Sequence, residues 1–88
     1  MKSFRLLIAT PTGKAFDGEA TQLSVMGECG SLSIMAGHIP FVTNVKSGKC
    51  RIYADNKVLN CESLGGLLSV TKDCVSLITT AFSVKEEN

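Results

Sequence analysis

The segment Gly27–Thr43, which reads GECGSLSIMAGHIPFVT, limits the fold of this chain more than any other stretch. Gly37 in its middle can adopt a positive φ, and the ring of Pro40 fixes φ at about −65°. Such a sequence cannot continue a helix, so we expect a sharp turn of the chain here. The segment also contains the only histidine, His38, and we therefore expect the evidence for a specific function in this region.

Apolar and polar residues alternate through most of the chain, which is the period of a half-buried β-strand. In Glu19–Met26, for example, Leu23 and Val25 fall on one face. No stretch has the spacing of apolar residues that an amphipathic helix requires. We predict one all-β domain at residues 1–83, a two-sheet β-sandwich of about eight to ten short strands. A polar, frayed end is expected at residues 84–88.

Short polar or glycine-containing segments are predicted as turns between these strands. They are Thr10–Gly13, Phe16–Gly18, Glu28-Cys29, Lys46–Lys49, Asp55-Asn56 and Lys72-Asp73. Gly65-Gly66 differs from these turns because it interrupts an apolar run. Adjacent glycines inside a strand pattern indicate a β-bulge or a close approach of another backbone.

The charges of the chain are balanced, with nine basic and eight acidic residues and a net charge of +1. Binding to nucleic acid requires clustered positive charge, which the sequence lacks, so we expect no nucleic-acid partner. Near the N-terminus, the apolar run Leu6–Ala9 is too short for the core of a signal peptide. It is also far short of a membrane span, so we expect a cytoplasmic chain that does not insert into a membrane.

Four cysteines, Cys29, Cys50, Cys61 and Cys74, are widely spaced along the chain. An even number of cysteines in a secreted small domain would suggest disulfides. Metal sites usually pair their ligands two to four residues apart, and this chain has no such pair. The pattern favours reduced thiols that serve as small apolar residues or surface groups.

An enzyme would need a nucleophile, a base and an orienting group that converge. The sequence offers Cys29 and His38 with Asp17 or Glu28, but none of them belongs to a recognisable nucleophile motif. A single histidine in a loop is more often structural or part of an interface. We therefore expect no catalytic residue, no cofactor and no metal, and a Cys/His-dependent enzyme remains the less favoured alternative.

Apolar residues crowd the turn region, namely Met35, Ile39, Pro40 and Phe41. Either these side chains pack on the core of the sandwich or they form a contact surface with a polar rim. The second interpretation predicts a protein-interaction module.

The segment Gly27–Thr43 resembles the N-terminal β-sandwich of the epsilon subunit of F-type ATP synthase. That family typically carries the pattern G-x-x-G-x-L-x-I-x-x-G-H-x-P, which is matched in register here by Gly27, Gly30, Leu32, Ile34, Gly37, His38 and Pro40. Three further segments resemble the family's F-x-G, K-x-G and G-G-x-x-x-V patterns, namely Phe16–Gly18, Lys46–Gly48 and Gly65–Val70. The resemblance extends from about Phe4 to Phe82.

This resemblance implies a non-catalytic rotor subunit that links the gamma subunit to the membrane c-ring and so couples ion transport to ATP synthesis. It implies a location on the cytoplasmic face of the cell membrane, as part of the complex. The residues that match gamma-facing positions are Thr10, His38, Pro40, Phe41 and Thr43. The residues that match c-ring-facing positions are Glu28, Cys29 and Ser31, although the family often has an acidic residue where Ser31 stands.

Family members usually continue into a C-terminal helical hairpin that can inhibit ATP hydrolysis and, in some members, bind ATP. The sequence stops at Asn88 before such a hairpin, as either a naturally short form or a truncated one, so we expect neither property by that route. Apolar surface meant for gamma could also let the isolated chain self-associate. A generic β-sandwich interaction module with another partner is the alternative function.

Overall fold

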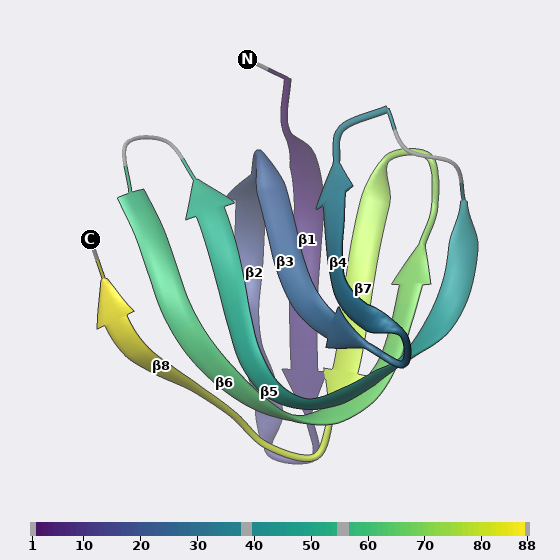
Figure 1. The fold of residues 1–88 in the computed structure, drawn as a ribbon. Helices are drawn as coiled ribbons and strands as arrows, with labels where there is room; N and C mark the ends of the chain where they lie inside the picture. The colour runs from purple at the N-terminus through teal and green to yellow at the C-terminus, as the bar shows by residue number, and fades with distance from the viewer. Residues whose placement is uncertain (1, 38–39, 55–56, 88) are drawn as a thin grey trace.

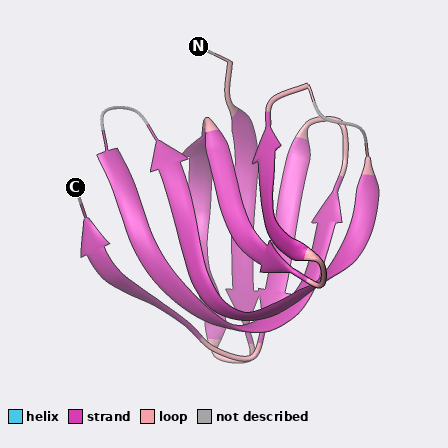
Figure 2. Cartoon of the chain, viewed as in Figure 1, coloured by secondary structure: helices cyan, strands magenta, loops and turns pink. Residues whose placement is uncertain are grey.

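A computed structural model of the chain describes residues 2–37, 40–54 and 57–87, which form eight β-strands and no helix (Figure 1, Figure 2). The strands are β1 Phe4–Thr10, β2 Gly13–Ala20, β3 Gln22–Gly27, β4 Gly30–Met35, β5 Phe41–Ala54, β6 Lys57–Val70, β7 Cys74–Thr79 and β8 Phe82–Glu87. The prediction of an all-β chain is therefore confirmed. Within the described part of the chain, no helix is long and apolar enough to cross a membrane.

The strands form two layers that are joined by the long strands β5 and β6, each of 14 residues. The first layer holds β2, β1 and β7 with the second half of β6 and the first half of β5. The second layer holds β8, the first half of β6, the second half of β5, β3 and β4. Figure 1 shows β5 and β6 curving together from one layer into the other. The predicted two-sheet sandwich is confirmed, with both sheets continuous through this hairpin.

The core lies between the layers and follows from the alternation in the sequence. Inward-facing residues of β1 and β7, such as Leu6, Ile8 and Leu77, are fully buried. From the second layer, Leu23 and Ile52 face them and are equally buried. Burial of one such side chain stabilises the fold by roughly 1.5–3 kcal/mol before the conformational entropy of ordering is subtracted.

The bend of the β5–β6 hairpin depends on Gly65 and Gly66. A Cβ atom on Gly66 would collide with the carbonyl oxygen of Ile78 on β7. Gly65 has a φ of 87°, and a Cβ atom there would lie 2.8 Å from the carbonyl oxygen of Val45. The buried Thr79 hydroxyl donates a hydrogen bond of 2.6 Å to the Gly65 carbonyl oxygen. The close backbone approach predicted at this glycine pair is confirmed.

Two of the predicted turns are wrong. Phe16–Gly18 lies inside β2, where its residues pair with Leu6 to Ile8 of β1. Lys46–Lys49 lies inside β5, at the place where the hairpin bends between the layers. In both cases hydrogen bonds from a neighbouring strand keep the backbone extended, and a short sequence window contains no information about that neighbour.

The other predicted turns have a clearer outcome. Thr10–Gly13 closes the β1–β2 hairpin, and Glu28-Cys29 closes the β3–β4 hairpin. Lys72-Asp73 separates β6 from β7. These three predictions are confirmed, whereas Asp55-Asn56 lies outside the described residues.

The C-terminal segment Phe82–Glu87 forms the strand β8. β8 pairs with β6 as far as Glu87, and Phe82 packs against the core. Without β8, the first half of β6 would present unpaired backbone groups at the edge of the second layer. A polar sequence such as Ser83–Glu87 can therefore form a strand, because backbone pairing rather than an apolar face holds it.

Candidate protein-interaction surfaces

The outer face of the first layer carries large exposed apolar side chains. Val42 on β5, Leu67 on β6 and Ile78 on β7 are 63%, 43% and 59% exposed. We call these three residues the outer apolar stripe. Leu67 pairs directly with Ile78, and Val42 lies two residues from Asn44, the partner of Leu67 on β5. Because side chains alternate along a strand, all three point away from the core on the same face of the sheet.

A charged cluster lies on the same layer, where β1 pairs with β2. The Arg5 guanidinium donates hydrogen bonds of 2.9 Å from Nε and 2.6 Å from Nη2 to Asp17 Oδ1. Lys14 Nζ lies 3.3 Å from Asp17 Oδ2. The hydrogen bond from Arg5 holds the pKa of the Asp17 carboxyl below its usual range, and Lys14 lowers it further. The outer apolar stripe thus has a polar margin, as protein-binding surfaces do.

The described residues that match gamma-facing positions lie at two places on the first layer. Thr10 ends β1, and its hydroxyl donates a hydrogen bond of 3.1 Å to the Gly13 carbonyl oxygen. Pro40 is exposed just before β5, whereas Phe41 and Thr43 are partly buried in that strand. The strands β7 and β6 lie between Thr10 and these residues. His38, the fifth predicted residue, lies outside the described residues.

Phe41 belongs more to the core than to an exposed surface. It packs against the buried cluster, and Phe41 and Thr43 alternate with the exposed Val42 along β5. The apolar turn region therefore divides, because Phe41 turns inward while Met35 remains 57% exposed. Ile39, the fourth apolar residue of that region, lies outside the described residues.

Sequence reasoning missed the outer apolar stripe, although the sequence contains a signal for it. In an alternating strand, two adjacent apolar residues cannot both face the core. Leu67-Leu68 and Leu77-Ile78 are such pairs, and in each the first or second residue is buried and its neighbour is exposed. Doublets of this kind indicate a sheet with apolar residues on both faces.

The residues that match c-ring-facing positions do lie together, at the β3–β4 hairpin. Glu28 and Cys29 form its exposed tip, and the exposed Ser31 follows on β4. The Glu28 carboxylate accepts a hydrogen bond of 3.1 Å from the Asn44 side-chain amide. This contact limits the orientations of the only carboxylate at the tip.

The cysteines occupy the places that the sequence predicted for small apolar and surface groups. Cys50 and Cys61 are buried, Cys29 is exposed and Cys74 is half-buried, and all four are free thiols. Burial, and then the nearby Cys61, raise the pKa of the Cys50 thiol to about 12. Burial alone raises the pKa of Cys61 to about 11. Both buried thiols are therefore neutral at physiological pH.

The geometry gives little support to the alternative function, a Cys/His-dependent enzyme. Cys29 lies at the tip of the β3–β4 hairpin, whereas Asp17 is held by Arg5 and Lys14 on the first layer. His38, the proposed base, lies outside the described residues. No group of three or more His, Cys, Asp or Glu side chains that could hold a metal ion occurs among residues 2–37, 40–54 and 57–87.

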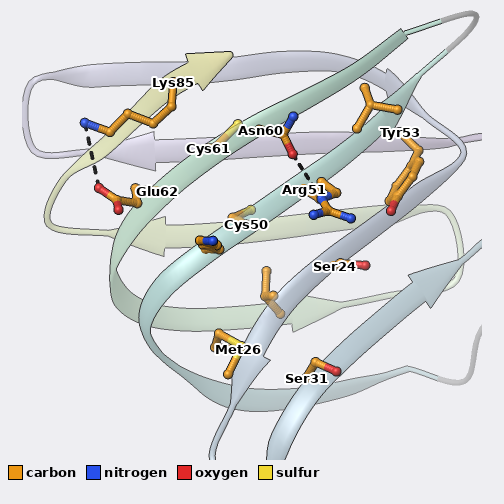
Figure 3. A pocket seen from close by; sticks show the side chains of 13 residues that line it. Ser24, Met26, Ser31, Cys50, Arg51, Tyr53, Asn60, Cys61, Glu62 and Lys85 are labelled. Carbon is orange, nitrogen blue, oxygen red and sulfur yellow. Dashed lines mark hydrogen bonds and ion pairs between the residues drawn. The ribbon is translucent and has the colours of Figure 1, made fainter. Parts of the chain in front are cut away.

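An open hollow of about 820 Å³, lined by both polar and apolar residues, lies over the second layer (Figure 3). Two contacts cross it. Arg51 Nε donates a hydrogen bond of 3.0 Å to Asn60 Oδ1, and Lys85 Nζ lies 3.7 Å from Glu62 Oε1. Its lining combines charged groups such as Arg51 and Glu62 with apolar side chains such as Met26 and Val58.

Together, the sandwich and the outer apolar stripe define a class of protein, a small all-β domain with an exposed face suited to contact with another protein. A family model described as "ATP synthase, Delta/Epsilon chain, beta-sandwich domain" matches residues 3–84. The chain therefore belongs to the ATP synthase delta/epsilon chain family, as its β-sandwich domain. This finding confirms the resemblance first noted at Gly27–Thr43.

Individual relatives agree with the family. The ATP synthase epsilon chain of Bacillus velezensis is 35% identical over 86 residues, which cover 98% of this chain and 65% of that protein. The sodium ion specific ATP synthase epsilon chain of Acetobacterium woodii is 37% identical over 87 residues, with coverage of 98% and 65%. This chain thus spans about two thirds of the length of these relatives.

Solved structures support the fold. A chain of the Euglena gracilis mitochondrial ATP synthase superposes with a TM-score of 0.87 over 93% of this chain and 53% of that chain, at 15% identity. A chain from the central stalk and c-ring of the Tetrahymena thermophila mitochondrial ATP synthase gives a TM-score of 0.78 at 16% identity, covering 94% of this chain and 67% of that chain. At these identities the comparison concerns the fold alone.

Proposed function

We propose that this chain is a non-catalytic subunit of the rotor of an F-type ATP synthase. It links the gamma subunit to the c-ring in the central stalk, on the cytoplasmic face of the membrane, and so couples ion transport to ATP synthesis. The observation that carries this proposal is the family match over residues 3–84. The outer apolar stripe supports it, because a subunit that works by docking needs a surface of this kind.

Gamma binds the outer face of the first layer. The outer apolar stripe supplies the apolar centre of the contact, and Thr10 and Pro40 lie toward its margin. The backbone under the stripe is held in paired strands, so little conformational entropy is lost when a partner covers it. Phe41 supports this surface from beneath, through its packing on the core.

The c-ring contacts the β3–β4 hairpin. Its tip presents the Glu28 carboxylate, oriented by Asn44, and the exposed side chains of Cys29 and Ser31. Because Ser31 is neutral, charge pairing with the c-ring depends on Glu28 rather than on residue 31. Replacement by Glu28→Lys should therefore weaken c-ring binding, and the loss should diminish as salt is raised.

Binding to a gamma subunit of F-type ATP synthase from the same organism tests the proposal. Ile78→Glu places a charge at the centre of the outer apolar stripe, and Ser33→Glu places the same charge on the exposed face of the second layer. We expect Ile78→Glu to weaken binding by about tenfold or more, because burial of an unpaired charge opposes association. Calorimetry should show that Ser33→Glu binds like the unmodified chain.

The outcome also separates the alternatives. A folded Ile78→Glu variant that binds gamma with unchanged affinity would reject the outer apolar stripe as the docking surface. If the unmodified chain does not bind gamma at all, the generic interaction module with another partner becomes the better function.

A further inference from the structure

Two cysteines face one another across the β5–β6 hairpin. Cys50 on β5 and Cys61 on β6 are register partners in the antiparallel pair. They are 2% and 3% exposed, and both are free thiols. Figure 3 shows them on neighbouring strands at the hollow, to whose lining both contribute. Neither is used by the docking surfaces described above.

The strand geometry brings this pair within the range of a disulfide. Directly opposed residues of an antiparallel pair have Cα atoms about 4.5–5.5 Å apart, and disulfides join Cα atoms about 4.4–6.8 Å apart. Opposed side chains also point to the same side of the sheet, so both thiols face the core. Cys61 Sγ donates a hydrogen bond of 3.5 Å to the Leu59 carbonyl oxygen and no disulfide is present.

The other two cysteines have no such relation to this pair. Cys29 lies at the exposed tip of the β3–β4 hairpin, and Cys74 begins β7 in the first layer. Cys74 pairs with Arg5 of β1 rather than with either strand of the β5–β6 hairpin. The fold therefore favours the Cys50–Cys61 pair over every other pairing of the four cysteines.

We propose that Cys50 and Cys61 form a site of reversible covalent modification, an intramolecular disulfide made by exchange with a low-molecular-weight disulfide such as oxidised glutathione. One cysteine loses its proton and attacks a sulfur of the reagent, which forms a mixed disulfide and releases one glutathione thiolate. The second cysteine then attacks the protein sulfur of that mixed disulfide and releases the other thiolate. Both released thiolates take up protons, so two protein thiols are oxidised while one reagent disulfide is reduced.

Access controls the rate of this exchange. The hollow lies over the outer face of the second layer and carries Lys49, Arg51, Lys85 and Glu62, whereas both thiols face the core. The reagent therefore reaches the thiols only when the hairpin opens locally. Because the attacking species is the thiolate and burial raises both pKa values, exchange is slow at neutral pH and accelerates about tenfold for each pH unit.

The consequence for the fold is a covalent link beside the bend of the β5–β6 hairpin. The link closes residues 50–61 into a ring, and these strands belong to the second layer. A cross-link there restricts the unfolded chain and holds the two strands in register. The oxidised protein should therefore unfold at a higher urea concentration than the reduced one.

The test uses the full chain with Cys29→Ser and Cys74→Ala, which leaves only the proposed pair. This variant is equilibrated with oxidised and reduced glutathione, alkylated, and digested for mass spectrometry. We expect a peptide pair joined through Cys50 and Cys61, with the loss of two hydrogens, about 2 Da, from the intact mass. The matched control, which adds Cys61→Ser, should instead stop at a mixed disulfide or remain unmodified.

A second arm compares the folded variant with the same variant in urea at each glutathione ratio. The fold should raise the disulfide fraction above that of the unfolded chain, because it holds the thiols together. Equal or lower oxidation of the folded chain overturns the proposal, as does a folded chain that retains two free thiols at equilibrium. The unmodified chain is mapped in parallel, so a failure of the double variant to fold does not decide the result.

Discussion

Gly66 lies where the β5–β6 hairpin bends from one layer into the other. Its Cα approaches the β7 backbone so closely that an added Cβ would collide with the Ile78 carbonyl oxygen. Neither partner can yield easily, because both atoms belong to paired strands. No flexible side chain is present at this contact to absorb the displacement.

We predict that Gly66→Ala lowers the free energy of unfolding by about 3 kcal/mol, since overpacking against backbone forces the strands apart. The matched control is Gly18→Ala, whose added Cβ would meet only Phe16 side-chain atoms at 3.6 Å and 3.7 Å. That change should stay within about 0.5 kcal/mol. Urea denaturation measures both, and similar values for the two variants would contradict the argument.

A second prediction for a single residue concerns the stability of the fold at low pH. The folded state lowers the pKa of Asp17 below 3.8, chiefly through its hydrogen bond with Arg5. A lowered folded pKa contributes stability that is present above the unfolded pKa and disappears as pH falls through the folded pKa. Asp17→Asn should therefore be slightly less stable than the unmodified chain at pH 7, and the difference should disappear as pH falls through the folded pKa.

Salt provides the control for this acid prediction. The ion pair is exposed to solvent, so its contribution should be small and should shrink in concentrated salt. Asp73→Asn, at an exposed carboxylate that forms no ion pair within the described part of the chain, should show no such dependence on salt. A difference between Asp17→Asn and the unmodified chain that does not shrink in acid would assign its effect to packing instead.

At the scale of elements, the β5–β6 hairpin joins the two layers, and Thr79 of β7 is attached to its bend. The Thr79 hydroxyl donates a hydrogen bond to the buried Gly65 carbonyl oxygen, with a second acceptor, the Ala81 carbonyl oxygen, at 3.2 Å. Thr79→Val keeps the shape of the side chain and removes its donor. We expect a loss of about 1–3 kcal/mol in the free energy of unfolding, because a buried carbonyl loses its side-chain partner.

The neighbouring threonine supplies the control for that experiment. Thr80 is exposed and lies in the short connection between β7 and β8. Thr80→Val should change the free energy of unfolding by less than about 0.5 kcal/mol. Thermal unfolding of the two variants side by side gives the comparison, and equal losses would show that the hydrogen bond to Gly65 is not what stabilises the bend.

The same hairpin shows which part of the fold the sequence could predict. Strand periodicity identified the β-strands, because alternation reflects burial of one face and that is a local property. The local sequence predicts a turn at Lys46–Lys49, although the bend arises from the pairing of that segment with Glu62–Leu64. Pairing between distant segments is not encoded in either window alone, so a bend and a turn have the same local signature.

The two candidate surfaces also differ in how far the sequence alone could predict them. The β3–β4 hairpin residues Glu28, Cys29 and Ser31 are near one another in sequence, and they lie together in the structure. The outer apolar stripe collects one residue from each of three strands, which only the strand order brings together. The doublets Leu67-Leu68 and Leu77-Ile78 indicate an apolar outer face but cannot show that the exposed residues are neighbours.

For the whole molecule, the decisive property is the difference between its two outer faces. The first layer presents the outer apolar stripe with a charged cluster near one side, whereas the second layer presents a hollow of mixed lining. A partner that buries apolar area gains from the stripe, although Met26, Met35 and Val84 are also exposed on the second layer. The two outer faces therefore differ, and a docking partner can distinguish them without any catalytic group.

The same asymmetry leads to a prediction about the isolated chain, which we expect to self-associate weakly through the first layer. Two copies that cover each other's stripes remove apolar surface from water, but they also lose translational and rotational freedom. The balance suggests a dissociation constant of roughly 0.1–1 mM. Sedimentation velocity over a range of concentrations should show association for the unmodified chain and for Ser33→Glu, and a monomer for Ile78→Glu.

Competition between gamma and a second copy of this chain tests the prediction more strictly. If gamma and a second copy use the same face, addition of gamma must dissociate the self-associated species, because one stripe cannot be covered twice. A ternary species that contains two copies of this chain on one gamma subunit would contradict the shared face. Since Ile78→Glu should weaken both associations, a result in which it weakens only one of them would place the two partners on different surfaces.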